Sequence, residues 1–589
     1  MFSCKVVIDE TDLDRGKSPL PARVMTPRAE TSVGALYGFR FEYRDGIAIG
    51  ESLNPVTPDQ IEKLVRQCRH GRVDARMLGN DILLLVVVSD GFVNLISSIC
   101  CCRPLYYHHR RNHFCCSTSI RELGRVGVPL QTEESAVPEF LVYRYAVPPR
   151  TLYQGIKRLL GGESIRVDLP SGAIVETASF DFMRSSRDIH LTTSSEELPG
   201  ILREQLATTL GNHARSGVLL SGGLDSGALA SIALQLTKDV SSVSSSFGFI
   251  DETDAETEYA LSFARALPMS HHIYEGSEEE YLSGLVESIY VAEEPVHHLQ
   301  SVMLYLLFKN HARERYSVLF CGEGADGLFG NDMHSFLHRR RRVLAVARAL
   351  GGNALCRLLT EAFDVKDDRV RRLALDYGDD LQCDHHVLWT LGRYGDADFV
   401  RTHFGFDNAA ILESHKELMR RYPDRGMLDR VTMLSLLCEG AVSMYIWSKL
   451  AESQGIVIHY PFTATATVDY VTSLPWGEKL RESKFCIRSL LRRCHVPETL
   501  ITRPKLSFGF PYRHWALPGG MFQPILDLAQ EMFDPALLRS LQSEEPGRAM
   551  LLWNLINLYL WRKLMISNVS PDDLSLEILS RRRALIGRA

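Results

Sequence analysis

The pattern of apolar and polar positions divides the 589-residue chain into three stretches. Up to about residue 185, short apolar runs alternate with turn residues, as in GALYGFRFEYRDGIAIG and DILLLVVVSDG, which predicts a sheet-rich domain. From about residue 195, helical periodicity alternates with short, wholly apolar strands, which is typical of a parallel α/β sheet. After Gly330 the pattern is almost entirely helical, and we expect a helical extension on the α/β core. A chain this long needs at least two domains, which we place at residues 1–190 and 191–589.

The composition, 45% apolar and 23% charged, is that of an ordinary globular protein. The net charge of −6 gives no general affinity for polyanions, so we expect no nucleic-acid partner. The longest apolar run, Ile82 to Val88, has seven residues, whereas a membrane-spanning helix needs about 20. The N-terminal MFSCKVVIDETDLD turns acidic at once and lacks the basic and apolar regions of a secretory signal. We therefore expect no membrane insertion and a cytoplasmic location.

Thirteen cysteines are scattered irregularly, with Cys100, Cys101 and Cys102 in a row. In a reducing compartment we expect no disulfide framework. Three adjacent cysteines suggest a metal site, but adjacent residues of a strand point to opposite faces, and no CxxC spacing occurs in the chain. We therefore interpret them as small apolar side chains in the core.

The stretch SGVLLSGGLDSG, residues 216–227, combines a buried strand with a polar loop. Residues 218–220 form the strand by length and apolarity, and the apolar stripe of a helix begins at Ala228. Between them lie two glycines that let backbone N–H groups converge and two hydroxyl donors: Gly222, Gly223, Ser221 and Ser226. Together with the positive end of the helix, this combination binds a phosphate.

Asp225 lies inside the same loop and would repel a phosphate unless a divalent cation lay between them. Mg²⁺ suits this position because it binds carboxylate and phosphate oxygens. In the alternative interpretation the loop is a tight turn and Asp225 only caps the helix.

A second glycine loop, Gly322-Glu-Gly-Ala-Asp-Gly327, follows an apolar strand at 317–320. It matches the GxGxxG pattern of dinucleotide-binding loops, but no acidic residue follows about 20 positions later to hold a ribose. Two carboxylates inside the loop, Glu323 and Asp326, would also oppose a pyrophosphate. These acids suit a metal ion or a general base instead.

The two loops together, SGGLDS at 221–226 and CGEGADGLFG at 321–330, resemble the paired signatures of the asparagine synthetase-like ATP pyrophosphatases. The resemblance implies a C-terminal parallel-sheet α/β domain of the adenine nucleotide alpha hydrolase-like type with a helical extension. It also implies ATP and Mg²⁺ as cofactors, with the metal on Asp225 and Asp326. The residues that it implies in nucleotide binding are Val218, Leu219, Leu220, Ser221, Gly222, Gly223, Asp225, Ser226, Phe249, Cys321 and Gly322.

Three further segments follow in the family's order. GIVIHYPF at 455–462 resembles E-x-R-x-P-F, with Ile458-His459 where a basic residue is usual. Lys484-Phe-Cys-Ile-Arg488 resembles K-x-x-L-R. Thr502-Arg-Pro-Lys505 aligns with the R-x-K loop, which implies that Lys505 is the catalytic lysine. The whole resemblance runs from about residue 195 to about residue 520.

Residues 82–123 resemble the end of the glutaminase domain of the same family, which implies an N-terminal αββα sandwich of the Ntn type. Its members attack glutamine with an N-terminal cysteine, which needs its own amine as base. Here position 2 is Phe and the first cysteine is Cys4, and neither an RHRGP-type nor an NGEIYN-type segment occurs. We therefore expect a degenerate class II glutamine amidotransferase-like domain, kept as a scaffold without glutamine hydrolysis.

Family members with such a degenerate domain include β-lactam-forming synthetases and lasso peptide cyclases, both of which close rings by amide formation. The resemblance thus implies a lasso peptide cyclase, a macrolactam synthetase. An Asp or Glu side chain of a precursor peptide would be adenylated and then captured by that peptide's N-terminal amine, with release of AMP and pyrophosphate. Lys505 would stabilise the developing charge, and Glu323 would either accept the amine proton or orient its loop. A leader peptidase or leader-binding protein is an expected partner.

Two alternatives for the function stay open. The chain could be a β-lactam-type or ammonia-dependent asparagine synthetase-like ligase that acts on a small molecule, or a nucleotide-binding scaffold without activity. The roles of two residue clusters also stay open, with two interpretations for each. Glu294 and His297 are either substrate contacts or buried polar residues at a helix start. The run from Arg339 to Arg342 is either solvated or docks an acidic partner.

Overall fold

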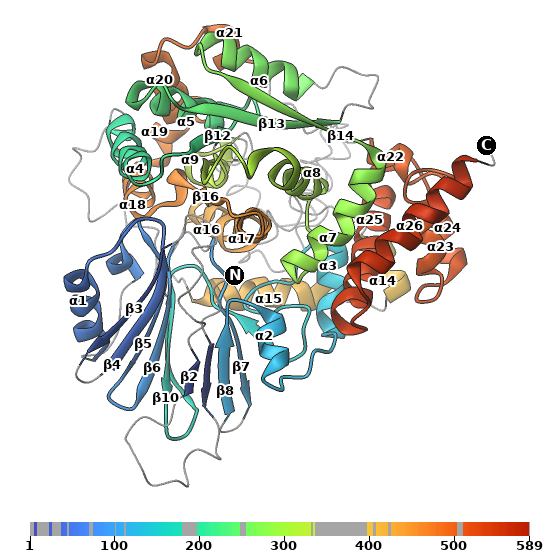
Figure 1. Ribbon diagram of the computed structural model, residues 1–589, viewed down its shortest axis with the longest axis horizontal. Coiled ribbons are helices and arrows are strands. Elements are labelled where there is room, and N and C mark those ends of the chain that lie inside the picture. Colours follow the sequence, from blue (N-terminus) through green and yellow to red (C-terminus); the bar gives the residue numbers. More distant parts are fainter. Residues whose placement is uncertain are drawn as a thin grey trace, which may run out of the picture.

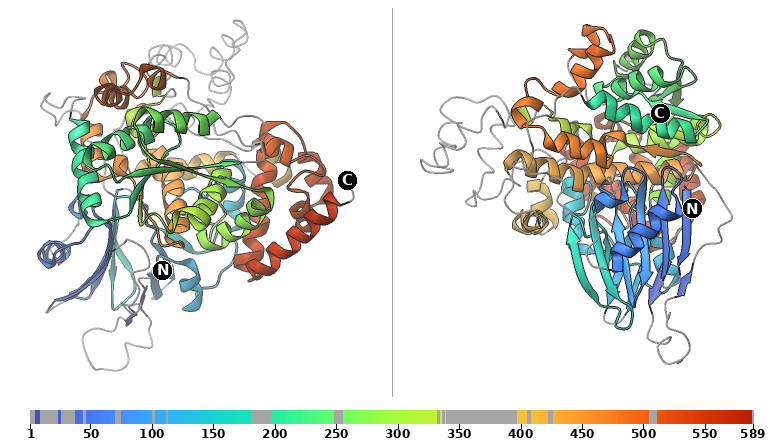
Figure 2. Two further views of the ribbon diagram at one scale, coloured as in Figure 1. Left: turned by 45° about the horizontal axis from the view of Figure 1, so that its top comes forward. Right: turned by 90° about the vertical axis from the view of Figure 1, so that its left-hand side faces the viewer.

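The structure is a computed structural model of the 589-residue chain. The residues that it describes are 5–8, 23–25, 37–43, 46–69, 75–99, 102–110, 113–179, 197–247, 255–331, 334–335, 338, 397–404, 408–421, 426–503 and 511–587. Figures 1 and 2 show an antiparallel sandwich on one side of the molecule and a parallel sheet wrapped in helices on the other.

The N-terminal part contains two antiparallel sheets. One has the strand order β2-β1-β8-β7-β9 and the other β11-β10-β6-β5-β4-β3. The strands are β1 (Lys5–Ile8), β2 (Arg23–Met25), β3 (Tyr37–Tyr43), β4 (Gly46–Ser52), β5 (Ile82–Ser89), β6 (Phe92–Ser97), β7 (Tyr106–Arg110), β8 (His113–Ser117), β9 (Ile156–Arg158), β10 (Glu163–Asp168) and β11 (Ile174–Ser179). The helices beside them are α1 (Pro58–Arg69), α2 (Ile120–Arg125) and α3 (Val137–Tyr143).

Strand β5 shows why these sheets stack in layers. Its side chains alternate between two cores, because successive strand residues point to opposite faces. Leu84 and Val86 pack between the two sheets, against Phe114 of β8. Leu85 and Val87 pack on the other face, against α1. The run of apolar residues is therefore a strand buried on both faces, and the predicted helix-sheet-sheet-helix layering is confirmed.

The C-terminal part is built on a five-stranded parallel sheet of order β14-β13-β12-β15-β16. Its strands are β12 (Ser216–Leu219), β13 (Ser241–Phe247), β14 (His271–Gly276), β15 (Val318–Phe320) and β16 (Val457–His459). From the central β12 the chain first extends the sheet on one side and then on the other. The carboxyl end of β12 is therefore a topological switch point, where open α/β sheets bind their ligands. The predicted parallel α/β fold is confirmed.

Helices surround this sheet and extend beyond it (Figure 1). Those of the α/β unit are α4 (Leu198–Asn212), α5 (Leu224–Leu236), α6 (Ala255–Ala266), α7 (Glu278–Ala292), α8 (Leu299–Leu307) and α9 (Ala325–Phe329). Those that follow are α14 (Ala397–Phe404), α15 (Asn408–Arg420), α16 (Met427–Ser435), α17 (Ala441–Glu452), α18 (Thr465–Ser473), α19 (Trp476–Lys479), α20 (Phe485–Arg493), α21 (Glu498–Ile501), α22 (Tyr512–Trp515), α23 (Gln523–Ala529), α24 (Pro535–Leu541), α25 (Pro546–Trp561) and α26 (Pro571–Ile586).

The structure adds one strand to the predicted helical extension. Strand β16 comes more than a hundred residues after β15 and pairs with it in parallel, with Leu319 opposite Ile458. Three residues are too short to show a strand periodicity in the sequence. Only the neighbouring strand determines that this segment is extended.

One long apolar helix lies inside the C-terminal part. It runs over Leu428–Glu452 and joins α16 to α17 through a π-helical segment, η5 (Leu436–Gly440). By length and composition it could cross a membrane, but 89% of its apolar window is buried within the protein. It is therefore a core helix of the fold.

Candidate nucleotide site and interdomain network

The loop between β12 and α5 presents polar groups at the switch point. Gly222 has φ of +69°, and a Cβ there would lie 2.6 Å from the backbone nitrogen of Ala260, so only glycine fits. The Ser226 hydroxyl donates to the carbonyl of Gly223 (3.2 Å) and accepts from the backbone N–H of Ser221 (3.3 Å). These bonds hold the loop as a compact cradle at the positive end of α5.

The N-cap of α5 is Gly223, with extended backbone and, in the described part of the chain, no side-chain cap. Asp225 lies in the first turn, not at the cap. The interpretation in which Asp225 merely caps the helix therefore does not fit. The start of α5 thus resembles the helix N-termini that bind phosphate in other proteins.

Asp225 and Asp326 are brought together by the sheet. Strands β12 and β15 are parallel neighbours, so the loops after them meet at the same edge. Gly322 packs directly on the first loop, because a Cβ there would lie 2.9 Å from the Cβ of Asp225 and 3.0 Å from the backbone nitrogen of Ser226. This close approach explains why a glycine stands at position 322.

A third residue, Lys484, joins the two carboxylates. Its Nζ lies 2.5 Å from Oδ2 of Asp225 and 2.7 Å from Oδ1 of Asp326. Lys484 is the N-cap of α20, with φ of +56°, and its backbone N–H donates to the carbonyl of Gly330 (3.0 Å). Burial opposes the charge of this lysine, but the two carboxylates outweigh it and raise the pKa of its ammonium. Asp225 and Asp326 therefore converge on one cation.

The convergence of Asp225 and Asp326 suits the binding of Mg²⁺ together with ATP. Two carboxylates that share one ammonium can also share one divalent cation, whose remaining positions phosphate oxygens and water can fill. Among the described residues no group of three or more His, Cys, Asp and Glu side chains could hold a metal by itself. The arrangement thus suits a metal bound together with a nucleotide, on Asp225 and Asp326.

Arg503 adds a further positive charge at the first loop. Its guanidinium donates a hydrogen bond to the carbonyl of Gly222 and stacks over the ring of Tyr259, at 3.7 Å from the ring centroid. The chain just before the predicted catalytic lysine is therefore held against the phosphate cradle. Lys505 itself lies outside the described residues.

The residues predicted for the adenosine side have different surroundings. The side chains of Val218 and Leu220 are buried in the core with α4 and α5, and that of Leu219 points to the opposite core. Contact between the first two and a nucleotide would thus involve their main chain. Cys321 is buried, and its backbone N–H donates to the carbonyl of His459. Phe249 lies outside the described residues.

Glu323 is half-buried on the second loop. The next residue, Gly324, has φ of +89°, and a Cβ there would lie only 2.2 Å from Cγ2 of Thr463 in η6 (Pro461–Thr463). This contact fixes the path of the loop that carries Glu323. Glu323 lies on the same loop as Asp326, and a carboxylate is one of the groups that can act as general base.

His459 does not replace the basic residue that is usual in its segment. Its Nδ1 lies 3.1 Å from the hydroxyl of Thr209 on α4, within the core. Burial and the nearby His213 lower the pKa of His459 to about 3. It is therefore neutral and carries no charge toward a nucleotide.

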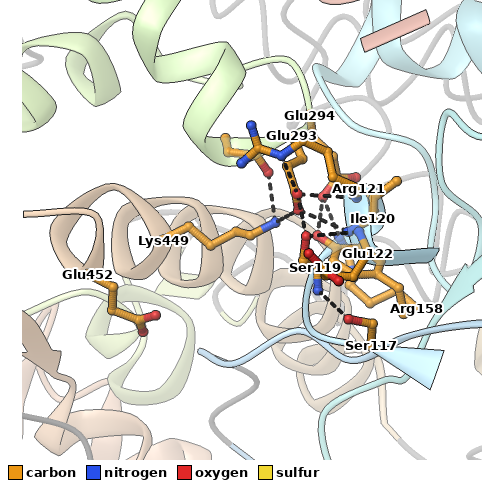
Figure 3. A network of polar contacts seen from close by, with 12 residues as sticks. Ser117, Ser119, Ile120, Arg121, Glu122, Arg158, Glu293, Glu294, Lys449 and Glu452 are labelled. Atoms are coloured by element: carbon orange, nitrogen blue, oxygen red, sulfur yellow. Dashed lines mark hydrogen bonds and ion pairs between the residues drawn. The ribbon is translucent and has the colours of Figure 1, made fainter. Parts of the chain in front are cut away.

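A buried polar network centred on Glu293 joins the two parts of the molecule (Figure 3). Its carboxylate accepts hydrogen bonds from the Ser119 hydroxyl (2.6 Å), the Ile120 N–H (3.0 Å) and Nε of Arg121 (3.0 Å), all at the start of α2. Lys449 of α17 lies 2.7 Å away on the other side. Burial opposes the charge of Glu293, but Lys449 and Arg121 outweigh it and hold its pKa below the usual value.

Glu294 continues this network instead of facing the phosphate cradle. Its carboxylate accepts a hydrogen bond from the Tyr106 hydroxyl (2.7 Å) and lies 3.9 Å from the guanidinium of Arg158. A third link between the two parts is Arg103, whose guanidinium pairs with Glu51 and with Glu452. For Glu294 the structure favours the buried polar interpretation over substrate contact.

Two other sequence predictions fall partly or wholly on undescribed residues. Cys100, Cys101 and the run from Arg339 to Arg342 lie outside the described part of the chain. Cys102 is buried in the core. The boundary predicted between residues 185 and 195 also lies outside it, so the limits of the two domains stay a prediction.

Lys484 is the residue that sequence reasoning left without a role. Its segment was identified from the spacing of Lys484 and Arg488, but nothing local shows that the side chain reaches a loop some 260 positions earlier. A signal was nevertheless present: two acidic loops predicted to meet require a nearby cation, and Lys484 belongs to a matched segment.

Comparisons with known proteins agree with this geometry. Residues 197–563 match the family described as Asparagine synthase. The chain is similar to putative glutamine-hydrolyzing asparagine synthetases of Mycobacterium bovis and Mycobacterium tuberculosis, with 23% identity over 490 residues that cover 78% of this chain and 72% of the relative. It is also similar to the glutamine-hydrolyzing asparagine synthetase 1 of Bacillus subtilis, with 22% identity over 484 residues that cover 76% and 71%.

Proposed function

This chain belongs to the asparagine synthase family, and from that premise we propose that it is an ATP-dependent C–N ligase that closes a macrolactam in a precursor peptide. The main observation behind the proposal is that Asp225 and Asp326 both contact Lys484 beside the glycine loop, at the carboxyl end of β12. Two carboxylates and an ammonium group in this position suit the binding of a metal-bound polyphosphate such as ATP.

In the proposed reaction the cradle at 221–226 binds the phosphates of ATP. A substrate carboxylate attacks the α-phosphorus, the bond to the β-phosphate breaks, and pyrophosphate leaves with the electron pair. Mg²⁺, held by Asp225 and Asp326, would neutralise charge on the phosphate oxygens. Lys484 and Arg503 contact the cradle loop at Asp225 and Gly222, and their positive charge would favour the departing pyrophosphate.

The second step is attack of an amine on the acyl-adenylate. The peptide's N-terminal nitrogen forms the amide bond, AMP leaves, and the amine loses one proton. Glu323 lies on the same loop as Asp326, and we propose that it accepts this proton. Lys505 would stabilise the oxyanion formed during this attack. If Glu323 acts as base, Glu323→Gln should change the acidic limb of the pH–rate profile. An unchanged profile would remove it from this role.

Two features support a peptide substrate over free aspartate and glutamine. The first is the resemblance to ring-closing family members, and the second is the predicted loss of glutamine hydrolysis in the N-terminal domain. The names of the similar mycobacterial and Bacillus proteins favour a second candidate, an asparagine synthetase-like ligase for a small molecule. A precursor peptide and a leader-binding protease are the expected partners of the first candidate only.

The test is mass spectrometry of the purified chain with Mg·ATP and candidate precursor peptides. Ring closure predicts a product lighter by one water, with AMP formed in equal amount. Conversion of free aspartate and ammonia to asparagine, without any effect on peptides, would establish the second candidate instead. No AMP with either substrate class would contradict both.

Glutamine hydrolysis is checked in the same preparation. We expect no glutamate release from glutamine, with or without Mg·ATP. Glutaminase activity that disappears in Cys4→Ala would overturn the proposal that the N-terminal domain is only a scaffold.

A further inference from the structure

We propose that His297 and His298, together with Ser443, Glu439 and Arg144, form a subsite that binds the backbone amides of the substrate next to its activated carboxylate. The inference rests on the proposed function and names the part of the molecule that would recognise a peptide. It also gives the N-terminal domain a role in the reaction.

The first observation is a buried imidazole, that of His297, in which one ring nitrogen has no hydrogen-bond partner among the described residues. His297 lies between α7 and α8 and is 1% exposed. Its Nε2 lies 2.8 Å from the hydroxyl of Ser443 on α17, whereas its Nδ1 is buried and has no hydrogen-bond partner within the described structure. Buried polar atoms are nearly always paired, and an unpaired one costs free energy. Such an atom points to a ligand that supplies the missing bond.

The second observation is that the neighbouring residue repeats this feature. The Nδ1 of His298 is also buried without a partner among the described residues. The two rings are arranged edge to face, with 5.6 Å between their centroids. Two unpaired ring nitrogens in adjacent residues thus belong to one cluster at the start of α8.

The chemistry of the cluster suits a peptide group. Burial, and next the charge of Arg144, lower the pKa of His298 to about 3, and burial with both neighbours lowers the pKa of His297 well below its ordinary value. Each imidazole is therefore neutral, with one N–H donor and one acceptor nitrogen. A backbone amide offers the matching acceptor and donor. Because Arg144 and Glu439 compensate each other, the cluster carries no net charge that would favour a free anion.

The cluster is close to the reacting loops. On the long helix that carries Ser443, Thr432 donates to the carbonyl of Gly327 (3.0 Å), and the Sδ of Met444 lies 4.0 Å from where a Cβ of Gly324 would stand. Ser443, which His297 contacts, is the residue before Met444 on this helix, so the cluster and the loop of Glu323 adjoin the same part of α17.

The helix is also irregular at this place. Glu439 belongs to the π-helical segment η5, and such segments are frequent at functional sites. The Oε1 of Glu439 lies 3.4 Å from the guanidinium of Arg144, which comes from the end of α3 in the N-terminal domain and is 2% exposed. The sandwich thus contributes a residue to the substrate side of the ligase, which would explain why it is kept without its own activity.

The test measures peptide binding separately from ring closure. The probe is an N-acetylated, C-amidated pentapeptide with one central Asp, which cannot cyclise because its amine is blocked. Its dissociation constant is measured by calorimetry for the wild-type chain, for His297→Phe, which removes both ring nitrogens, and for His297→Gln, which can still bond to Ser443. We expect binding about tenfold weaker in His297→Phe, the loss of about one buried hydrogen bond. His297→Gln should restore part of the affinity, and ATP binding should be unchanged in both.

His213→Gln serves as the matched control, since His213 is a buried, neutral histidine bonded to a carbonyl far from this cluster, and it should bind the probe like the wild type. Arg144→Met should weaken binding of the probe without changing the affinity for ATP. Equal probe affinity in wild type and His297→Phe, or no binding of the probe by the wild type, would overturn the subsite. If the wild type nevertheless closes a peptide ring, the proposed function stands without the subsite. If the affinity for the probe depends on His297 but no peptide is cyclised, the subsite is supported and the proposal of ring closure is contradicted.

Discussion

Lys484 shows how much of the candidate site depends on a single side chain. Its ammonium lies between Asp225 and Asp326, which the sequence had placed on two glycine loops a hundred residues apart. Without it, two partly buried carboxylates would face each other at the same edge of the sheet. At this scale the sequence assigned the acids and the glycines to two loops that the structure brings together, and it missed the cation between the two acids.

Replacing Lys484 by Met should therefore destabilise the fold and increase its response to Mg²⁺. We expect a loss of about 2–3 kcal/mol in the free energy of unfolding, below the value for a fully buried pair because the side chain of Asp326 is 41% exposed. Millimolar Mg²⁺ should recover part of this loss, since a divalent cation can replace the ammonium. Denaturant unfolding with and without Mg²⁺ measures both effects.

The matched control is Lys309→Met, which removes a half-exposed lysine paired with Glu287. It should change the free energy of unfolding by about 1 kcal/mol or less and leave the response to Mg²⁺ unaltered. An equal response to Mg²⁺ in Lys484→Met and the wild type would show that the two carboxylates do not share a cation site.

Lys505→Ala should abolish ligation and leave ATP binding largely intact. The physical reason is that a positive charge aimed at a developing oxyanion contributes a factor of about 10²–10³ in rate, while the cradle and its paired aspartates bind the nucleotide without it. Single-turnover product formation and ATP affinity separate the two effects. Near-normal ligation in this variant would mean that Lys505 is not the catalytic lysine.

Among the elements, the start of α2 and the end of α7 form a buried polar link between the two parts of the molecule. The carboxylate of Glu293 accepts hydrogen bonds from the N-cap residue Ser119 and from the first backbone N–H of α2, although it comes from the other part of the chain. Helix N-termini favour an anion, and Lys449 supplies the compensating cation from α17. Three elements from distant stretches are therefore held by one side chain that is itself fully buried.

The pH dependence of stability should report on this link. Because the folded-state pKa of Glu293 is below its unfolded value, its stabilising contribution is present above about pH 4.5 and is lost as the pH falls further. Glu293→Gln should cost about 3–5 kcal/mol at pH 7 and should reduce the loss of stability on acidification. Urea unfolding of both proteins at neutral pH and at acidic pH gives the comparison. The same acid sensitivity in both would contradict the role of Glu293.

At the scale of the whole molecule, one large hydrophobic cluster spans both parts. The cluster that contains Ile120 and Phe140 of the N-terminal domain also contains Leu285 of α7 and Trp553 of α25. Each part contributes residues to this shared cluster, so unfolding of one part would expose apolar surface of the other. The polar network around Glu293 lies within the same interface (Figure 3).

The two parts should therefore unfold together. Five of the six tryptophans come after residue 446 and the sixth is Trp389, so none lies in 1–190. Tryptophan fluorescence therefore reports on the C-terminal part alone. Far-UV circular dichroism reports on both. We expect the two signals to give one coincident urea transition. A separate transition seen only by circular dichroism would show that the sandwich folds independently.

By itself, the sequence determined the layers of the fold, the two glycine loops and the acids that they carry. These features are local: an apolar run buried on both faces, a strand followed by a glycine turn, and a helix start each follow from a few adjacent residues. Tertiary structure alone decided that β16 is a strand, that Lys484 reaches Asp225 and Asp326, and that Glu293 accepts hydrogen bonds from the start of a helix in the other domain. In each case the partner is a hundred or more residues away. No local preference identifies such a partner, because only the packing of the whole chain brings the two groups together.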